Sequence, residues 1–290
     1  MTDNPPDSGR TYVTTKVAVP DPPETIEANP IHGSAGAAAA GYAGALVAGV
    51  HTYGWASAAV LDAFGDRWLG DGWADVAYRR PVYDGDELVT TATRVVGDGA
   101  GDGDTDAVVS LRTVAAGDRV VLDGTAGIGR ATWFDELEVP EWRDPQPPVP
   151  EAELVRMELA SAPLHRDFRP MAVDATRSFA TAWASTRLED HDPRWHDGEQ
   201  PWLHPSFLAG RMTPLFRHNY RYGPAIHVRT RIQHLAPARA GQCLVVAARL
   251  HAAYERKGHH YHESDCWIFG EDGTALAAKR HIGIFELAAR

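Results

Sequence analysis

The feature that most constrains the fold is an order of predicted elements that occurs twice along the chain. In the first half a helix is predicted over residues 49–64, with Gly65 as its C-terminal cap. Four strand-like segments separated by glycine and aspartate turns follow it: 73–83, 87–96, 107–115 and 119–133. A helix followed by a run of four strands indicates a helix packed on an antiparallel sheet.

The same order returns in the second half. Helices are predicted over residues 172–187 and 206–219. Four strands are predicted after them: 227–235, 243–256, 259–269 and 274–286. The repetition predicts an α+β protein with an internal duplication, in which two helix-on-sheet units share a core.

A proline-rich segment, residues 140–150, separates the two halves. It contains five prolines, and proline stiffens a chain while removing a hydrogen-bond donor. We therefore interpret it as a linker between an N-terminal unit, residues 1–139, and a C-terminal unit, residues 151–290. A chain of 290 residues is long enough for one large domain or two ordinary ones.

Composition excludes several classes of protein. With 44% hydrophobic and 23% charged residues the chain is typical of soluble globular proteins, and its net charge of −11 disfavours nucleic acid and anionic membranes as partners. No run approaches the roughly 18 apolar residues of a membrane span, and no basic region precedes an apolar one at the start. Two cysteines favour thiols in a reducing compartment, so we expect a cytoplasmic protein.

Charge is distributed unevenly. Residues 1–145 hold 10 basic and 23 acidic side chains, whereas the remainder holds 18 and 16. Residues 200–254 contain seven arginines, Arg229 and Arg231 among them, and no Asp or Glu. Guanidinium groups pair with phosphates, which favours an anion site. The alternative is that these arginines pair with the acidic first half across an internal interface.

The most informative segment for chemistry is Glu27-Ala28-Asn29-Pro30-Ile31-His32. Pro30 favours an extended Asn29, and the tight reversal that follows would bring the Glu27 carboxylate and the His32 imidazole together around one water molecule. Further along, Gly49 opens the predicted central helix. The first amides of a helix have no partner within it, so those of Gly49 and Val50 are suited to a developing oxyanion.

This segment resembles the MaoC-like, (R)-specific enoyl-CoA hydratase family of hotdog proteins, whose signature is an acid, any residue, Asn, Pro, an aliphatic residue and His. Residues 29–32 match it, Gly49 corresponds to the family's oxyanion glycine, and residues 80–87 resemble its strand-turn-strand. Glu27 stands where the family has Asp, and Ala48 where it usually has His. The resemblance implies a double hotdog: two antiparallel sheets, each wrapped around a long central helix, in one chain.

The resemblance also implies an activity, the hydration of a 2-enoyl thioester or the dehydration of a 3-hydroxyacyl thioester. Glu27 and His32 would handle the water, Asn29 would fix the turn and Gly49 would polarise the thioester carbonyl. No metal or redox cofactor is expected, and coenzyme A enters as part of the substrate. An acyl carrier protein is the other possible carrier, and the chain is a possible homodimer.

The second half carries an altered copy of the motif. Asp192-Pro193 stands where Asn-Pro is expected and Trp195 where the His is expected, so we predict that this half is not catalytic. Its arginine-rich segment would bind the diphosphate and 3′-phosphate of coenzyme A through Arg229 and Arg231.

Several local alternatives remain at this stage. Val50 and Tyr53 on the central helix are candidates to line an acyl pocket, although aromatic residues there more often belong to the core. His260 and His262 share one face of a strand but lack a third ligand at a telling spacing, so no metal site is expected. Residues 97–106 are interpreted as a hairpin tip rather than a calcium loop. The alternative functions are a thioesterase and a non-catalytic acyl-thioester-binding subunit.

Overall fold

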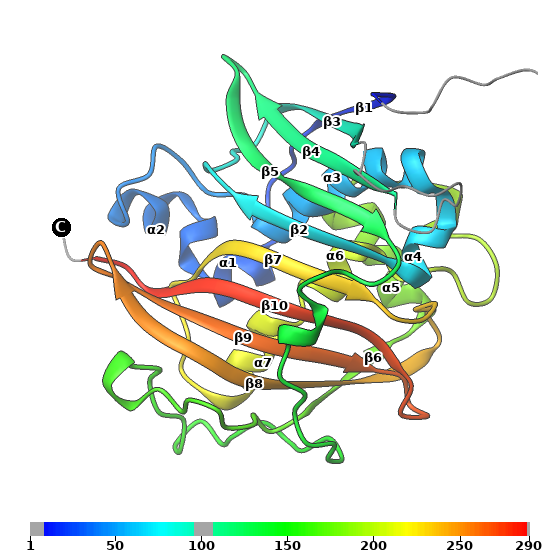
Figure 1. Cartoon of the computed structure of the whole chain (residues 1–290). Coiled ribbons are helices and arrows are strands. Elements are labelled where there is room, and N and C mark those ends of the chain that lie inside the picture. Colours follow the sequence, from blue (N-terminus) through cyan, green and yellow to red (C-terminus); the bar gives the residue numbers. More distant parts are fainter. Residues whose placement is uncertain (1–8, 96–106, 289–290) are drawn as a thin grey trace, which may run out of the picture.

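The computed structural model describes residues 9–95 and 107–288, which form one ten-stranded antiparallel sheet with helices on its concave side (Figure 1). The first half contributes β1 (Thr11–Val17), β2 (Gly72–Tyr78), β3 (Glu87–Val95), β4 (Val108–Ala115) and β5 (Arg119–Ile128). The second contributes β6 (Met171–Ala175), β7 (Ile226–His234), β8 (Gln242–Arg256), β9 (His259–Phe269) and β10 (Ala275–Glu286). Their order across the sheet is β1-β3-β4-β5-β2-β7-β10-β9-β8-β6.

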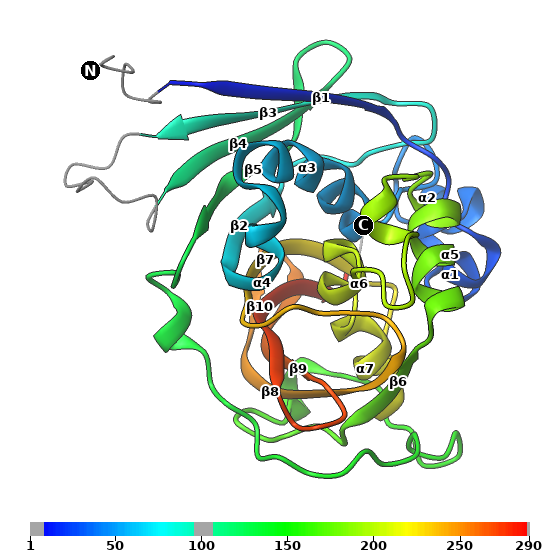
Figure 2. The same cartoon turned by 90° about the vertical axis from the view of Figure 1, so that its right-hand side faces the viewer.

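The sheet order contains the internal repeat that the sequence predicts. Each half has one strand, then helices, then four strands. The equivalent strands of the second half follow one another across the sheet in the reverse order of those of the first. The two sheets that we expected are joined into one, because β2 and β7 pair in antiparallel fashion with Asp75 opposite Arg231. Figure 2 shows the joined sheet curving around the helices of both halves.

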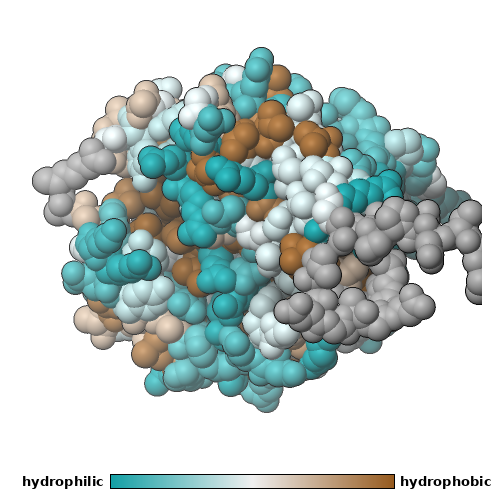
Figure 3. Space-filling model, turned by 45° about the horizontal axis from the view of Figure 1, so that its top comes forward, coloured by the Kyte–Doolittle hydropathy of each residue, from teal (hydrophilic) through white to brown (hydrophobic). Residues whose placement is uncertain are grey.

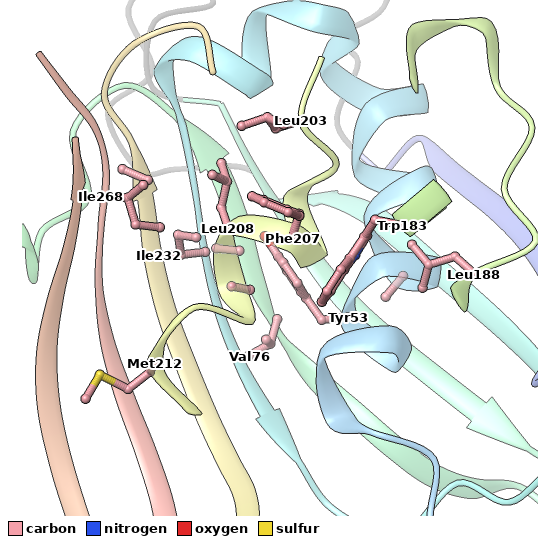
Figure 4. Close-up of a cluster of buried hydrophobic side chains, with 14 of the residues drawn as sticks. Tyr53, Val76, Trp183, Leu188, Leu203, Phe207, Leu208, Met212, Ile232 and Ile268 are labelled. Atoms are coloured by element: carbon pink, nitrogen blue, oxygen red, sulfur yellow. The ribbon is translucent and has the colours of Figure 1, made fainter. Parts of the chain in front are cut away.

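Helix α3 (Gly49–Phe64) is the central helix of the first half and has the predicted bounds. Gly65, at φ +65°, ends it as expected. Small residues allow close packing: a Cβ at Gly54 would meet Ser206 Cβ at 3.0 Å, in the short helix α6 of the other half. Tyr53 of α3 packs with Trp183, Phe207 and other core residues between helices and sheet (Figure 4).

The second half has a broken central helix where a continuous one was expected. Residues 206–219 form α6 (Pro205–Ala209) and α7 (Met212–Asn219), separated at Gly210 and Arg211. Pro214 explains the break, since in one long helix its ring would clash with the Gly210 carbonyl and it has no amide to donate. In the first turn of α7 the missing amide costs nothing.

The predicted helix over residues 172–187 is also divided. Its beginning is the edge strand β6, which pairs with β8, and only the rest is helical, as α5 (Arg177–Arg187). Thr176 separates the two, because its hydroxyl accepts a hydrogen bond from the Phe179 amide and caps α5. The sequence patterns did not predict β1 or three short helices: α1 (Pro23–Ala28), α2 (Ser34–Ala39) and α4 (Trp68–Asp71).

Residues 140–150 contain no helix or strand, and they lie against the second half. The Gln146 amide donates to Pro170 O and the Val149 amide to His218 O. Residues 97–106 lie outside the described residues. No helix within the described parts of the chain has the length and apolar character needed to cross a membrane.

Candidate functional site

A cavity of about 530 Å³ is lined by residues of both halves of the chain. The first half contributes residues around the predicted motif and the first turn of α3, among them Asn29, His32 and Gly49. The second half contributes residues of α5, α7 and β7, including Arg187 and Arg217. The cavity therefore lies where the two halves meet, and it contains most of the predicted catalytic residues.

Asp21 is the buried carboxylate that organises the first-half side of the site. Its Oδ2 lies 2.9 Å from His32 Nδ1, its Oδ1 lies 2.8 Å from His51 Nδ1, and its side chain has no exposure. Burial raises the pKa of Asp21, but the His32 and His51 imidazoles lower it by more, so the carboxyl pKa is well below its usual range. Asp21 is thus a buried carboxylate in close contact with both rings.

The same carboxylate holds the start of α3. Asp21 Oδ2 accepts a hydrogen bond of 2.8 Å from the Ala48 amide, one residue before the helix begins. Ala48 has no side-chain acceptor for the helix, so Asp21 supplies both that acceptor and a negative charge at the positive helix end. One side chain therefore fixes His32 relative to the first turn of α3.

The contacts of His32 define its tautomer. Its Nδ1 lies 2.7 Å from Leu46 O, and a carbonyl oxygen only accepts, so Nδ1 carries the proton. Its Nε2 lies 3.2 Å from Asn29 Nδ2, which only donates. In neutral His32 the Nε2 lone pair therefore accepts from Asn29 Nδ2, and it would serve as a base for a water molecule that displaced this contact; the side chain lines the cavity and is 12% exposed.

Gly49 and Val50, in the first turn of α3 at its positive end, are among the residues that line the cavity. No acceptor for either amide is found among the described residues, as expected for the first turn of a helix. Position 49 is closely packed, because a Cβ there would lie 3.2 Å from the Tyr78 ring and 3.4 Å from His227 Cβ, so these neighbours would have to shift by a few tenths of an ångström. The site thus combines an imidazole base with free amide donors.

The structure does not bring Glu27 to this site. Glu27 is exposed on α1 and is not among the cavity-lining residues, and the carboxylate beside His32 is Asp21. Short helix α1 turns position 27 outward, whereas the Pro-flanked segment before it passes behind His32. Of the predicted pocket residues, Val50 lines the cavity, but Tyr53 is fully buried in the core and does not.

Arg229 and Arg231 are also away from the cavity. Arg229 donates two hydrogen bonds of 2.6 Å to the Asp75 carboxylate, from its Nε and Nη2. Arg231 donates to Asp75 and Glu136. Asp75 lies on β2 of the first half, and both arginines lie on β7 of the second. Of the two interpretations of the arginine-rich segment, pairing across an internal interface is the one that the geometry of these two residues supports.

A different group of arginines surrounds a surface hollow of about 660 Å³ on the first half. Arg79 and Arg80 line both this hollow and the cavity, so the two are adjacent. Arg79 pairs with Asp123, whereas Arg80 and Arg112 are exposed and have no carboxylate partner among the described residues. The hollow is therefore an open, cationic surface beside the cavity.

Residues near the altered motif of the second half, Asp190, His204 and Ser206, form a largely buried network. His204 Nδ1 accepts from Ser206 Oγ, and its Nε2 lies 3.3 Å from Asp190 Oδ2. Although these are the residue types of a hydrolase triad, Ser206 has no exposure and neither it nor His204 lines the cavity. The network caps α6, since the Ser206 amide donates to His204 Nδ1.

The strand histidines considered for metal binding are separately engaged. His260 Nδ1 lies 3.0 Å from Glu286 Oε2, and His262 bonds to Tyr222 and Ser264. A different group, Glu138, His165 and His251, has ligand atoms within 4.8 Å of one another, but it lies outside the cavity, where His165 is exposed.

Solved structures with the same architecture identify the fold. The chain is similar to a MaoC-like dehydratase, with 14% identity over 96% of this chain and 98% of the other and a TM-score of 0.61. It is also similar to a Mycobacterium tuberculosis protein described as a double hotdog, with 14% identity over 96% of both chains and a TM-score of 0.65. The chain has a double hotdog fold. The predicted resemblance is therefore confirmed at the level of fold.

The chain is also similar to solved structures that are described in another way. One from Novosphingobium aromaticivorans, described as a candidate thioesterase, has 13% identity over 96% of both chains and a TM-score of 0.51. No protein-family model and no curated protein sequence matches this chain. At such identities the likeness concerns the fold, so the chemistry has to be argued from the site.

Sequence reasoning missed Asp21 and the polar role of His51 in this double hotdog. Asp21 stands between prolines outside the motif, in a segment that reads as a linker. One signal was present: a helix that begins at Ala48-Gly49 without a capping side chain needs an acceptor from elsewhere. His51 lies in the first turn of the helix whose first amides were singled out, and it lines the cavity.

Proposed function

We propose that this chain hydrates 2-enoyl thioesters and, in reverse, dehydrates 3-hydroxyacyl thioesters. One observation carries the proposal: Asp21 Oδ2 contacts both His32 Nδ1 and the Ala48 amide, so a single buried carboxylate sets the imidazole beside the free amides of α3. A base and oxyanion donors on one cavity wall are the two parts that this reaction needs. The fold shared with a MaoC-like dehydratase supports the same class.

In the proposed hydration, a water molecule displaces the contact between Asn29 Nδ2 and His32 Nε2, accepts a hydrogen bond from Asn29 Nδ2 and gives up a proton to His32 Nε2. The water oxygen forms a bond to C3 of the substrate, and the C2=C3 electron pair moves through C1 to the thioester oxygen. Gly49 and Val50 amides donate to that oxygen as it becomes negative. The enolate then takes a proton at C2 from His32, which restores the neutral imidazole.

Asp21 acts in this proposal as a positioning residue. It has no exposure and does not line the cavity, so it reaches the reaction only through His32 and the helix start. Its negative charge would stabilise the imidazolium that forms when His32 takes up a proton. Asp21 therefore takes the place beside His32 that the sequence suggested for Glu27, but it positions the imidazole and does not contact the water.

Coenzyme A is the carrier that we propose, with its phosphates in the hollow around Arg80 and Arg112 instead of at Arg229 and Arg231. Exposed arginines without carboxylate partners suit phosphate binding, and the hollow adjoins the cavity through Arg79 and Arg80. The proposed reaction uses no metal or redox cofactor.

The carboxylates that line the cavity favour hydration over thioester hydrolysis as the proposed reaction. Among the described residues that line it, Glu24 is the sole carboxylate, and Arg187 donates to it at 2.7 Å. No unengaged carboxylate on the described wall would activate water toward the thioester carbon. A cavity with an aligned imidazole likewise favours an enzyme over a subunit that only binds.

The test uses crotonyl-CoA with the purified chain. We expect the enoyl absorbance to fall and 3-hydroxybutyryl-CoA to appear on chiral chromatography, with no release of free thiol. His32→Ala should abolish turnover and retain binding. Free coenzyme A as the product would establish hydrolysis instead, and binding of a panel of enoyl-CoAs without turnover would establish a non-catalytic role.

A further inference from the structure

The second-half wall of the cavity carries three arginines, Arg187, Arg211 and Arg217. Arg187 is neutralised by Glu24. Arg211, only 4% exposed, donates to the Phe207 carbonyl and lies over the rings of Phe207 and Trp183. It has no carboxylate partner among the described residues, so this wall is cationic.

Arg217 is the arginine on this wall with hydrogen-bonding groups that lack a partner among the described residues. Its Nε and Nη2 are buried and have no partner in the described structure, on a side chain that lines the cavity from α7. Another buried polar atom on the lining, His281 Nδ1, is also without a partner. Buried polar groups are normally satisfied, and an unpaired buried cation is costly. These open groups therefore point to a polar ligand.

The geometry of the open groups indicates which ligand. Nε and Nη2 form one edge of the guanidinium, whose two parallel N–H bonds match the two oxygens of a carboxylate. Arg229 of this chain donates from the same edge to the Asp75 carboxylate, with both hydrogen bonds at 2.6 Å. The same edge of Arg217 has no hydrogen-bond partner within residues 9–95 and 107–288.

Two parts of a thioester substrate carry suitable anions: the phosphates of coenzyme A and a carboxylate on the acyl group. The hollow around Arg80 and Arg112 is open to solvent and suits the phosphates. Arg217 is instead partly buried, on a helix of the half opposite the reacting groups His32 and Gly49. An acyl group whose thioester lay at Gly49 would occupy the cavity that both walls line.

We propose that Arg217 binds a carboxylate on the acyl group, so that the substrates are thioesters of dicarboxylic acids. The identity of the reaction rests on the proposed function, but the binding preference does not. Arg217 then acts as a specificity residue, and an acyl group that ends in a methyl group leaves its guanidinium unpaired.

Succinyl-CoA and butyryl-CoA test the preference directly. They differ by a carboxylate in place of a terminal methyl group, and neither has a double bond to hydrate. By calorimetry we expect the unaltered chain to bind succinyl-CoA about tenfold or more tightly, as charge-assisted hydrogen bonds suggest. Arg217→Met should remove the preference, and Arg217→Lys, which keeps the charge without the paired edge, should retain part of it.

Arg221→Met is the matched control, because Arg221 is exposed, pairs with Glu151 and does not line the cavity. It should keep the full preference. Equal affinity of the unaltered chain for the two ligands would overturn the proposal. An equal loss for both ligands in Arg217→Met would also overturn it and would assign Arg217 to a coenzyme A phosphate.

Fumaryl-CoA and crotonyl-CoA, which differ in the same way, separate this proposal from the proposed function. A preference for succinyl-CoA without hydration of either enoyl-CoA would keep the carboxylate site and remove the hydratase assignment. Hydration of crotonyl-CoA without any preference for succinyl-CoA would do the reverse.

Discussion

The side-chain amide of Asn29 pairs with the backbone amide of Ala225. Asn29 Nδ2 donates to Ala225 O at 2.8 Å, and Asn29 Oδ1 accepts from Ala225 N at 3.2 Å. The motif in the first half is therefore fastened to the residue before β7 in the second. The remaining Nδ2 hydrogen faces His32 Nε2, so the same amide also acts on the proposed base.

Replacing this amide should affect both stability and turnover. Asn29→Asp retains an acceptor for the Ala225 amide but leaves Ala225 O and His32 Nε2 without a donor. We expect the free energy of unfolding to fall by about 1–3 kcal/mol, the usual effect of an unsatisfied buried polar group, and enoyl-CoA hydration to fall with it. Urea unfolding and initial rates measure the two effects, and an unchanged unfolding midpoint would contradict the proposed fastening.

Asp21 and Glu27 offer a matched pair of carboxylates. Asp21→Asn removes the charge beside His32, and we expect turnover to fall by about 10²- to 10⁴-fold, the range for acid–base catalysis. Glu27→Gln should change turnover by less than about twofold, because Glu27 is exposed and outside the cavity. Hydration rates with crotonyl-CoA decide the matter, and the opposite ranking would restore the acid that the sequence motif suggests.

Acid unfolding should report on Asp190. Burial raises the pKa of this carboxyl. The hydrogen bond from His204 and the charge of that ring lower it by more, so that the pKa is about 2. A lowered folded-state pKa stabilises the fold above the ordinary value of 3.8, and this stabilisation is lost as the pH falls from about 4 towards 2. Asp190→Asn should therefore cost about 1–2 kcal/mol at pH 7 and much less near pH 2. Urea unfolding at several pH values tests this, and a cost independent of pH would exclude the charge as its source.

The two groups of arginines should differ in their effect on coenzyme A affinity. Arg80→Gln with Arg112→Gln should weaken binding and reduce its dependence on salt, because two proposed phosphate contacts are lost. Arg229→Gln with Arg231→Gln should leave affinity and salt dependence unchanged. Calorimetry at two salt concentrations measures both pairs, and a weaker affinity in the second pair alone would favour the original assignment.

The repeat and most strands could be predicted from sequence because they depend on local patterns. The predicted α3 has the observed bounds because Gly49 and Gly65 mark its ends, and β9 matches its predicted range. Predictions failed where distant contacts outweighed local preference. Residues 172–175 have helical neighbours, yet they form part of an edge strand because β8 is available to pair with them.

The site could be predicted only in part. Asn29, His32 and Gly49 lie in a recognisable motif, and all three line the cavity. Asp21 could not be found in this way, since its role arises from a chain path that passes behind His32. The arginines required distances as well, because only pairing with Asp75 distinguishes Arg229 from a ligand-binding residue.

The break between α6 and α7 matters for how such a chain can diverge. In a symmetric dimer of identical subunits every substitution occurs twice, so a proline that interrupts one central helix would interrupt both. Fusing the copies removes that restriction. Here one copy keeps an unbroken helix whose first turn lines the shared cavity, while the other has a divided helix whose second segment carries Arg217 on the opposite wall.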